Sequence, residues 1–310
     1  MNVLDRNLVE DVAGRLRSDP GLVEKDWHVT RAVGVLAVFD HGTAAPAFGG
    51  GTSLSKGWGL IKRFSEDIDF KVTLAAATSR SKERKERSAY RERIIGALTE
   101  AGFTLAGDPV KRDESSFFSA ELFYPSLFAT GPGLRPHIRV EMSLLPAALP
   151  PVARPIASLI AAAQGKPPEI TSFLCVDPVE TAADKLSALA WRVHARRRGS
   201  DGDDPTIIRH LHDLAALKPT IGASGEFTAL VSRAMSDDEG RGGAATAVTP
   251  TRLLAGMLEE LATDPLWAAE YRDYVRQVSF ADPAELIGFD QALSALGDLV
   301  ALLQGSGGRT

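Results

Sequence analysis

The sequence predicts an α/β fold followed by an all-helical region, and three features of the chain indicate this class. Segments that alternate polar and apolar residues, as strands with one buried face do, lie at 67–72, 117–123 and 137–145. A charged segment at 79–100 has the composition of an exposed helix. After about residue 176 the pattern is helical to the C-terminus. We therefore expect a small mixed sheet with helices, followed by a helical bundle.

The remaining elements follow in chain order. The first 40 residues form a helical stripe, residues 46–49 a short strand, and residues 53–61 a helix. Asp177, Pro178 and Glu180 have the form of a helix start, and Gly199 is placed to end that helix near Arg198. Further helices are predicted near 206–217, 225–236, 250–262, 265–277 and 287–304.

A proline-rich segment separates the two halves. Six of the 18 prolines fall between Pro146 and Pro168, which indicates a boundary or an extended crossover. We accordingly predict a core domain with N-terminal helices over 1–150, and a mainly helical domain over 151–310 that completes an active-site cleft.

Composition limits the function classes. The 310 residues are 44% hydrophobic and 24% charged, which is ordinary for a globular protein with a buried core. The net charge of −5 means that a polyanion would have to meet a local basic patch. With Cys175 as its single cysteine, the chain cannot form an internal disulfide. It contains no run of 18 apolar residues of the kind that spans a membrane, and its N-terminus lacks signal-peptide features. We expect a cytoplasmic protein.

The most informative stretch begins with the glycine-rich turn Gly49-Gly50-Gly51-Thr52-Ser53. It is not a Walker A loop, because Lys56 follows a serine and precedes a glycine, and it lacks the third glycine of the dinucleotide fingerprint. Glycines still allow backbone N–H groups to approach a phosphate closely. The turn therefore predicts a phosphate-binding loop of another kind.

Asp67 and Asp69 follow this turn. They are two residues apart on a predicted strand, so both side chains leave the same face, while Ile68 and Phe70 point into the core. Adjacent carboxylates repel each other unless a cation lies between them, and magnesium binds one or two carboxylates together with phosphate oxygens. We predict that Asp67 and Asp69 bind Mg²⁺, with Mn²⁺ as an alternative. Glu141, on a neighbouring strand, is the candidate third ligand.

The block Gly50–Lys56 followed by Arg63–Asp69 resembles the AbiEii/AbiGii nucleotidyltransferase-like toxins, which include the MenT-type toxins and belong to the DNA polymerase β-like nucleotidyltransferase superfamily. Three other segments match motifs of the family: Glu24-Lys25-Asp26-Trp27, Asp184-Lys185-Leu186-Ser187-Ala188 with Arg192, and Arg209–Leu214. Where the family often has Arg-Asp-Xaa-Xaa-Asp, this chain has Arg209-His210-Leu211-His212-Asp213. Residues 220–310 match no motif.

The resemblance implies transfer of a nucleoside monophosphate from an NTP to an RNA acceptor, especially a tRNA 3′ end, by a toxin with a cognate antitoxin. It implies metal binding by Asp67 and Asp69, a triphosphate cradle formed by Gly50, Gly51, Thr52 and Ser53, and a requirement for Lys185 and Asp213. We expect Lys56, Ser65 and Arg192 to bind the nucleotide as well. Lys185 and Arg192 share one helix face, which suits phosphates.

Other interpretations stay open at this point. The acceptor could be a small molecule or a protein, and the chain could be a nucleotide-binding regulatory module without catalysis. Lys56 and Arg63 could simply pair with Glu66. The basic residues of 80–93 could contact nucleic acid or form a solvated helix face, and Arg196-Arg197-Arg198 could extend the same positive surface. We interpret His210 and His212 as structural, because two positions apart on a helix they do not face one site.

Overall fold

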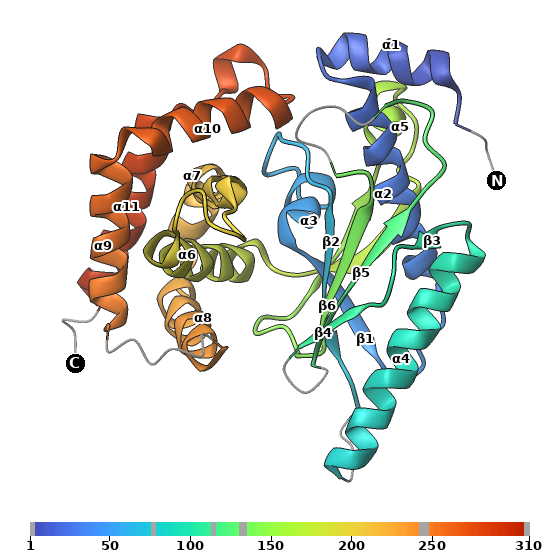
Figure 1. Ribbon diagram of the computed structural model, residues 1–310, viewed down its shortest axis with the longest axis horizontal. Coiled ribbons are helices and arrows are strands. Elements are labelled where there is room, and N and C mark those ends of the chain that lie inside the picture. Colours follow the sequence, from blue (N-terminus) through green and yellow to red (C-terminus); the bar gives the residue numbers. More distant parts are fainter. Residues whose placement is uncertain (1–3, 76–78, 113–115, 130–134, 242–247, 307–310) are drawn as a thin grey trace. The chain divides into compact units, whose positions relative to one another are not determined.

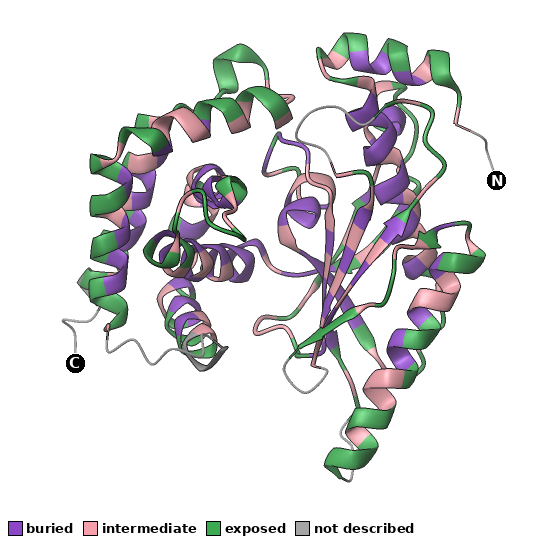
Figure 2. Ribbon diagram, in the orientation of Figure 1, coloured by how far each residue is buried: buried purple, intermediate pink, exposed green. Residues whose placement is uncertain are grey.

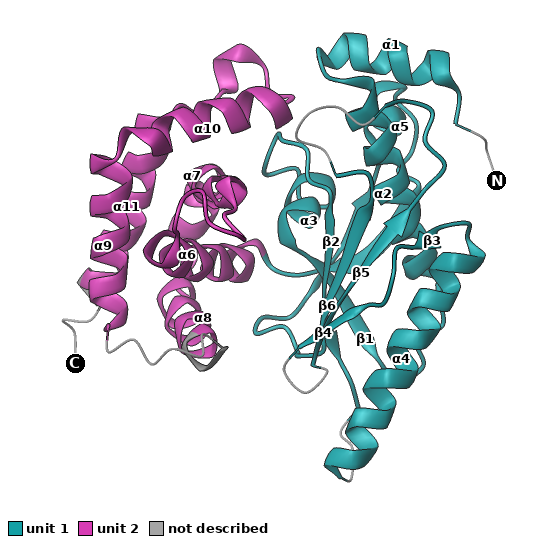
Figure 3. Cartoon of the chain, viewed as in Figure 1, with its two compact units in different colours: residues 1–177 teal, residues 178–310 magenta. Residues whose placement is uncertain are grey.

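The computed structural model describes residues 4–75, 79–112, 116–129, 135–241 and 248–306 (Figure 1). The chain forms two compact units, Met1–Asp177 and Pro178–Thr310 (Figure 3). The first unit holds a mixed sheet with helices, and the second unit is helical in its described residues. The predicted class, α/β followed by α, is therefore confirmed.

The sheet of the first unit has eight strands in the order β3-β5-β6-β2-β1-β8-β7, with β4 paired to β5. The strands are β1 Ala45–Gly49, β2 Asp67–Thr73, β3 Thr104–Leu105, β4 Val110–Arg112, β5 Phe117–Phe123, β6 Ile138–Ser143, β7 Val152–Ile156 and β8 Ile170–Cys175. In the middle of the sheet, β2 pairs with β1 in the antiparallel sense and with β6 in the parallel sense.

The predicted alternation along the central strands is confirmed. Ile68, Phe70 and Val72 of β2 are buried, and the residues between them are half-buried. The apolar side chains of β2, β5 and β6 share one core with residues of α2 and α4, so these two helices cover that face. The opposite face is left with the polar residues of the same strands.

The helices of the first unit are α1 Arg6–Leu16, α2 Pro20–Val38, α3 Gly50–Lys56, α4 Arg80–Glu100 and α5 Leu159–Ala163. The helix predicted at 53–61 thus begins three residues earlier and ends at Lys56. Gly57 donates its backbone N–H to the Ser53 carbonyl and closes the last turn. Starting the helix at Gly50 places the glycine turn directly against the end of β1.

The two units meet in the sequence at Asp177 and Pro178, not after residue 150. The proline-rich segment that suggested the earlier boundary contains β7 and α5, and β8 follows it and lies beside β1 in the sheet. Pro155 is tolerated in β7 because β7 is an edge strand, where a missing N–H leaves no ladder bond unmade. The short strand β8 carries no clear alternation, and the sequence did not predict it.

The second unit consists of α6 Pro178–Ala195, η2 Pro205–Ile208, α7 Arg209–Gly222, α8 Phe227–Arg241, α9 Pro250–Thr263, α10 Pro265–Val278, η3 Pro283–Glu285 and α11 Phe289–Ser306. All the predicted helices of this half are present. The first of them, α6, ends at Ala195 instead of near Arg198, and Gly199 adopts a left-handed conformation in the turn that follows.

One segment among the described residues, Pro283–Gln304, is long and apolar enough to resemble a membrane span, with a mean hydropathy of 1.5. A helix in the core of a folded domain can be equally long and apolar. Leu296, Leu299 and Val300 of α11 are buried within the unit, and Asp298 forms an ion pair with Lys218 of α7. The apolar face of α11 is therefore used in packing against its neighbours.

Candidate active site

The polar face of the sheet brings the predicted carboxylates together across neighbouring strands. In the parallel pairing of β2 with β6, Asp69 lies opposite Glu141 and Asp67 lies opposite Arg139. Ser119 of β5 lies opposite Glu141 from the other side, and its hydroxyl is 3.5 Å from Glu141 Oε1. The prediction that Glu141 occupies a strand beside the two aspartates is confirmed.

These carboxylates do not form a closed metal cage. Among the residues that the structure describes, no three His, Cys, Asp or Glu side chains converge closely enough to hold a metal ion. Glu141 Oε1 instead lies 3.9 Å from Arg139 Nη1. A magnesium ion bound with a nucleotide needs only one or two protein carboxylates, because phosphate oxygens and water complete its shell. The donor set Asp67 and Asp69 fits that requirement, while Glu141 remains a predicted ligand.

The glycine turn is pressed directly against this strand. Gly50 has a φ of +67°, in the left-handed region that favours glycine. A Cβ at Gly50 would overlap the carboxylate of Asp69, lying 2.6 Å from its Cγ. A Cβ at Gly51 would meet Arg63 Nη2 at 2.8 Å and Ser65 Oγ at 2.9 Å. The glycines therefore allow the turn to approach the aspartate strand and the predicted residue Ser65.

The other predicted loop residues are occupied by contacts within the protein. Thr52 and Ser53 are almost fully buried, and the Thr52 hydroxyl donates to the backbone carbonyl of Asp67. Lys56 Nζ forms an ion pair with Asp26 Oδ1 at 2.5 Å, in which both side chains are buried. Lys56 thus ties α3 to α2, and a contact with phosphate would require this pair to open. The alternative prediction, that Lys56 pairs with Glu66, finds no support in the ion pairs of the described residues.

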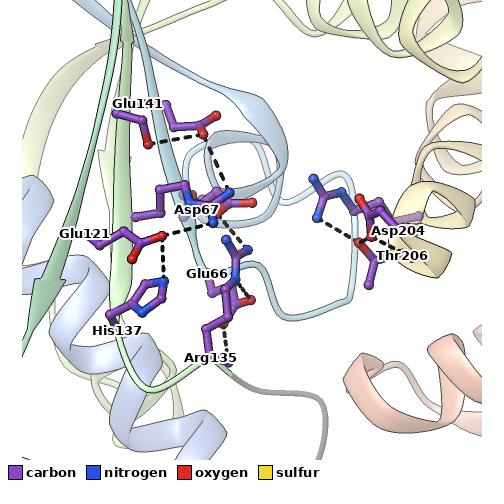
Figure 4. Close-up of polar contacts among 12 residues, drawn as sticks. Glu66, Asp67, Glu121, Arg135, His137, Glu141, Asp204 and Thr206 are labelled. Atoms are coloured by element: carbon purple, nitrogen blue, oxygen red, sulfur yellow. Dashed lines mark hydrogen bonds and ion pairs between the residues drawn. The ribbon is translucent and has the colours of Figure 1, made fainter. Parts of the chain in front are cut away.

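Arg135 is a residue at this site that sequence reasoning missed. Its Nη2 donates to Asp67 Oδ1 at 2.8 Å and its Nε to Glu66 Oε1 at 2.6 Å (Figure 4). The desolvation of Arg135 by itself lowers its pKa, but the two carboxylates outweigh that effect and raise the pKa above its usual value. The only signal in the sequence was an arginine three residues before β6, the strand that carries Glu141.

The motif Glu24-Lys25-Asp26 on α2 anchors three separate segments to the core. Glu24 accepts hydrogen bonds from the backbone N–H groups of Leu127 and Phe128, and Lys25 forms an ion pair with Glu66. All three side chains of the motif are buried. Desolvation lowers the pKa of Lys25, and the negative charge of Glu66 opposes that effect. The motif is therefore structural, and through Glu66 it reaches the candidate site.

In the second unit, the two predicted catalytic residues form a buried ion pair. Lys185 Nζ on α6 lies 2.8 Å from Asp213 Oδ2 on α7, and the Asp213 side chain is completely buried. His212 Nδ1 lies 3.5 Å from Asp213 Oδ1. Arg192 is exposed on α6, seven residues and two helical turns after Lys185. The structure thus joins two residues that are 28 positions apart in the sequence.

A sequence comparison decides the family. The profile described as "Nucleotidyl transferase AbiEii toxin, Type IV TA system" matches residues 36–295, which span most of both units. The chain belongs to the AbiEii nucleotidyltransferase toxin family. It is accordingly a nucleotidyltransferase toxin of a type IV toxin–antitoxin system, with a nucleotide substrate and an antitoxin partner.

Two further comparisons add little to this assignment. Among solved structures, MenT4, a nucleotidyltransferase toxin from Mycobacterium tuberculosis H37Rv, is similar to this chain at 20% sequence identity. That alignment has a TM-score of 0.49 and covers 97% of this chain and 99% of MenT4. No curated protein matches the sequence. Membership of the AbiEii family therefore rests on the profile match.

This AbiEii chain differs from the family pattern at His210. Burial, and after it the nearby cations Lys185, Arg209 and Arg192, hold the pKa of His210 well below its usual value. His210 is therefore neutral where the family often has an aspartate. In the described part of the chain, neither of its ring nitrogens has a hydrogen-bond partner. The negative charge that the family often has at this position is therefore absent, and Asp213 is the acidic residue of this motif that pairs with Lys185.

The basic segments of this AbiEii chain are only partly available to a polyanion. On α4, Arg87 pairs with Glu83 and Arg91 is buried, whereas Arg84 and Lys85 are exposed. The ten residues of α4 before Tyr90 contain no buried residue, and Figure 2 shows that end of the helix as mostly exposed. A basic face on α4 is therefore present but smaller than its seven cations suggested.

The Arg196-Arg197-Arg198 run of the second unit is largely neutralised by contacts within that unit. Arg196 pairs with Asp203 at 2.8 Å and with Glu270 at 2.6 Å, and Arg198 pairs with Asp264. Both guanidinium groups also lie over the Trp267 ring, with Cζ about 4.5 Å from the ring centroid. Of these three arginines, only Arg197 is exposed. The predicted positive surface is here largely a neutralised cluster that packs α10 against the end of α6.

Proposed function

We propose that this AbiEii toxin transfers a nucleoside monophosphate from an NTP to a hydroxyl of an RNA acceptor, with a tRNA 3′ end as the preferred one. The observation that supports this most directly is the close approach of Gly50 to Asp69, beside Asp67 on the same strand face. A phosphate-binding turn pressed against two carboxylates is the arrangement that a metal–triphosphate complex requires. The reaction would take place in the cytoplasm.

Asp67 and Asp69 are the residues proposed to hold the divalent cation, Mg²⁺ or Mn²⁺, with Glu141 on the adjacent strand as a third ligand. When bound, such a cation supplies charge stabilisation for the transferred phosphoryl group and lowers the pKa of the attacking hydroxyl. The left-handed Gly50 keeps the turn close enough for its backbone N–H groups to reach phosphate oxygens. Lys185 and Asp213 are proposed to be required for activity, and Arg192 and Ser65 to bind the nucleotide.

The reaction balances as a simple displacement. The acceptor hydroxyl oxygen forms a bond to the α-phosphorus of the NTP, the bond from that phosphorus to the bridging oxygen breaks, and pyrophosphate leaves. The hydroxyl proton passes to a carboxylate or to water. Since no bond to the protein forms or breaks in this displacement, its residues contribute by positioning the two substrates and by stabilising charge on the phosphates.

The RNA acceptor is supported by the exposed cations of α4. Lysine and arginine side chains at the start of a helix are disfavoured by the helix dipole, and Glu83 is the only acidic residue in the first turn. A basic N-terminal half that buries nothing is therefore not explained by packing. A polyanionic acceptor such as RNA explains the charge better than a small molecule does.

Radiolabelled NTP incubated with total tRNA, total protein and Mg²⁺ tests the proposal. Label on tRNA supports it, label on protein identifies a different acceptor class, and no label favours a nucleotide-binding module without catalysis. Asp67→Asn should abolish labelling. A matched control is Asp203→Asn, because Asp203 also accepts from an arginine at 2.8 Å and is similarly buried. Near-normal labelling by folded Asp67→Asn protein would exclude the proposed site.

A further inference from the structure

Arg135 holds Asp67 in a way that concerns cation binding. Its guanidinium bridges two carboxylates, with Nη2 2.8 Å from Asp67 Oδ1 and Nε 2.6 Å from Glu66 Oε1 (Figure 4). Both distances are those of charge-assisted hydrogen bonds. Asp67 is only 14% exposed and Arg135 only 27%, so water screens this pair incompletely. A positive charge therefore already lies against the carboxylate that is proposed to bind the metal.

Contacts with Glu66 and Lys25 hold Arg135 in place independently of Asp67. Glu66 Oε2 accepts from the backbone N–H of Arg135 at 3.3 Å, in addition to the bond from Nε. Lys25, which is completely buried, donates to Glu66 and also to the backbone carbonyl of Arg135 at 2.6 Å. The main chain and side chain of Arg135 are thus both anchored to the core through Glu66 and Lys25.

The positive charges of this network offset part of the negative charge that a free cation would meet at Asp67. Lys25 and Glu66 neutralise each other, and Arg135 neutralises Asp67. A dication bound to Asp67 would lie within a few ångströms of the guanidinium, at a distance where repulsion between partly buried charges is strong. A triphosphate brings several negative charges and would offset that repulsion. The cation and the nucleotide should therefore bind far better together than the cation does alone.

We propose that Arg135 is a positioning residue that competes with a free divalent cation for Asp67, so that the cation binds tightly only together with the triphosphate. This inference rests on the proposed function, because it assumes that Asp67 is a metal ligand. It adds a residue outside the recognised AbiEii motifs and makes tight cation binding depend on the nucleotide. Lys25 and Glu66 contribute by keeping the guanidinium in place.

Mn²⁺ binding measured by electron paramagnetic resonance tests this without any turnover, since bound Mn²⁺ loses its free-ion signal. The titration is run on the full chain alone, on the full chain with a non-hydrolysable NTP analogue, and on the analogue without protein, so that Mn²⁺ bound by the analogue itself is subtracted. Arg135→Gln should bind Mn²⁺ about tenfold more tightly than wild type in the absence of nucleotide, and the gain in affinity from added nucleotide should shrink by a similar factor. Arg87→Gln, which removes another partly buried arginine paired with a carboxylate in the same unit, should leave both values unchanged.

Unchanged or weaker Mn²⁺ binding by folded Arg135→Gln protein would overturn the inference. If circular dichroism shows that this variant is unfolded, Arg135→Lys answers the question, because lysine cannot bridge both carboxylates. It should bind free Mn²⁺ several-fold more tightly than wild type, and equal binding would overturn the inference. Failure of the proposed function looks different: neither wild type nor Arg135→Gln would bind Mn²⁺ even with nucleotide, and Asp67→Asn would change nothing.

Discussion

Replacing Gly50 with alanine tests the close approach on which the candidate site depends. Gly50 has a φ of +67°, and Gly59 has a φ of +64°, so an alanine at either position costs about 1–2 kcal/mol for the left-handed backbone. The two positions differ in their surroundings. A Cβ at Gly59 meets nothing within 4 Å, whereas at Gly50 it would overlap the carboxylate of Asp69. Gly59→Ala is therefore a control that isolates the displacement of Asp69.

The expected effect on activity follows from that displacement. Real Cβ atoms do not approach other heavy atoms closer than 3.0 Å, and Asp69 Cγ would be at 2.6 Å with its carboxylate oxygen nearer still. Asp69 would have to move by on the order of 1 Å, and a misplacement of that size lowers the rate by about 10²-fold. This corresponds to about 2.7 kcal/mol in the activation barrier.

Two measurements separate stability from activity in these variants. Urea denaturation should show a loss of stability in both variants, larger in Gly50→Ala because the overlap with Asp69 adds to the backbone cost that the two share. Labelling of the acceptor by radioactive NTP should fall about 100-fold in Gly50→Ala alone. If the two variants label the acceptor at rates within a few-fold of each other, Asp69 does not need its present position, and the reasoning about the turn is refuted.

Three further predictions concern other parts of the chain. Lys185→Met should lower the free energy of unfolding by about 3–5 kcal/mol in urea denaturation, because it leaves Asp213 buried without this lysine. The double variant Lys185→Met/Asp213→Leu should recover most of that loss. A Lys185→Met protein within about 1 kcal/mol of wild type would contradict this prediction. Burial lowers the pKa of His28 to about 4, from a value near 6.5 in the unfolded chain. The neutral His28 side chain therefore contributes fully to the free energy of unfolding above pH 6.5, and this contribution decreases by about 3 kcal/mol as the pH falls towards 4. Thermal melts of His28→Phe should lack that part of the acid destabilisation, and parallel pH curves for the two proteins would disprove it. Reversing Arg84 and Lys85 to glutamate should reduce the log–log salt slope of RNA binding by about 1.4, measured by fluorescence anisotropy, with NTP binding unchanged; an intact slope would mean that α4 presents only a solvated face.

The local patterns in the sequence predicted much of the fold correctly. Strand alternation at Asp67–Val72 determined which residues face the core, because a strand with one buried face repeats every two residues. Helix periodicity and capping signals located the helices of the second unit. The strand β8 was missed because it is short and lacks alternation, and its proline-rich approach resembled a linker.

The sequence by itself identified the two aspartates, the glycine turn and the family, because these are contiguous residues whose chemistry depends on close spacing along the chain. Only the tertiary structure showed what each charged side chain contacts. Lys56 pairs with Asp26, and Arg135 reaches Asp67 from 68 residues away. Such pairs join residues that are distant in the chain. They depend on strand register and helix packing, which cannot be read from a single sequence.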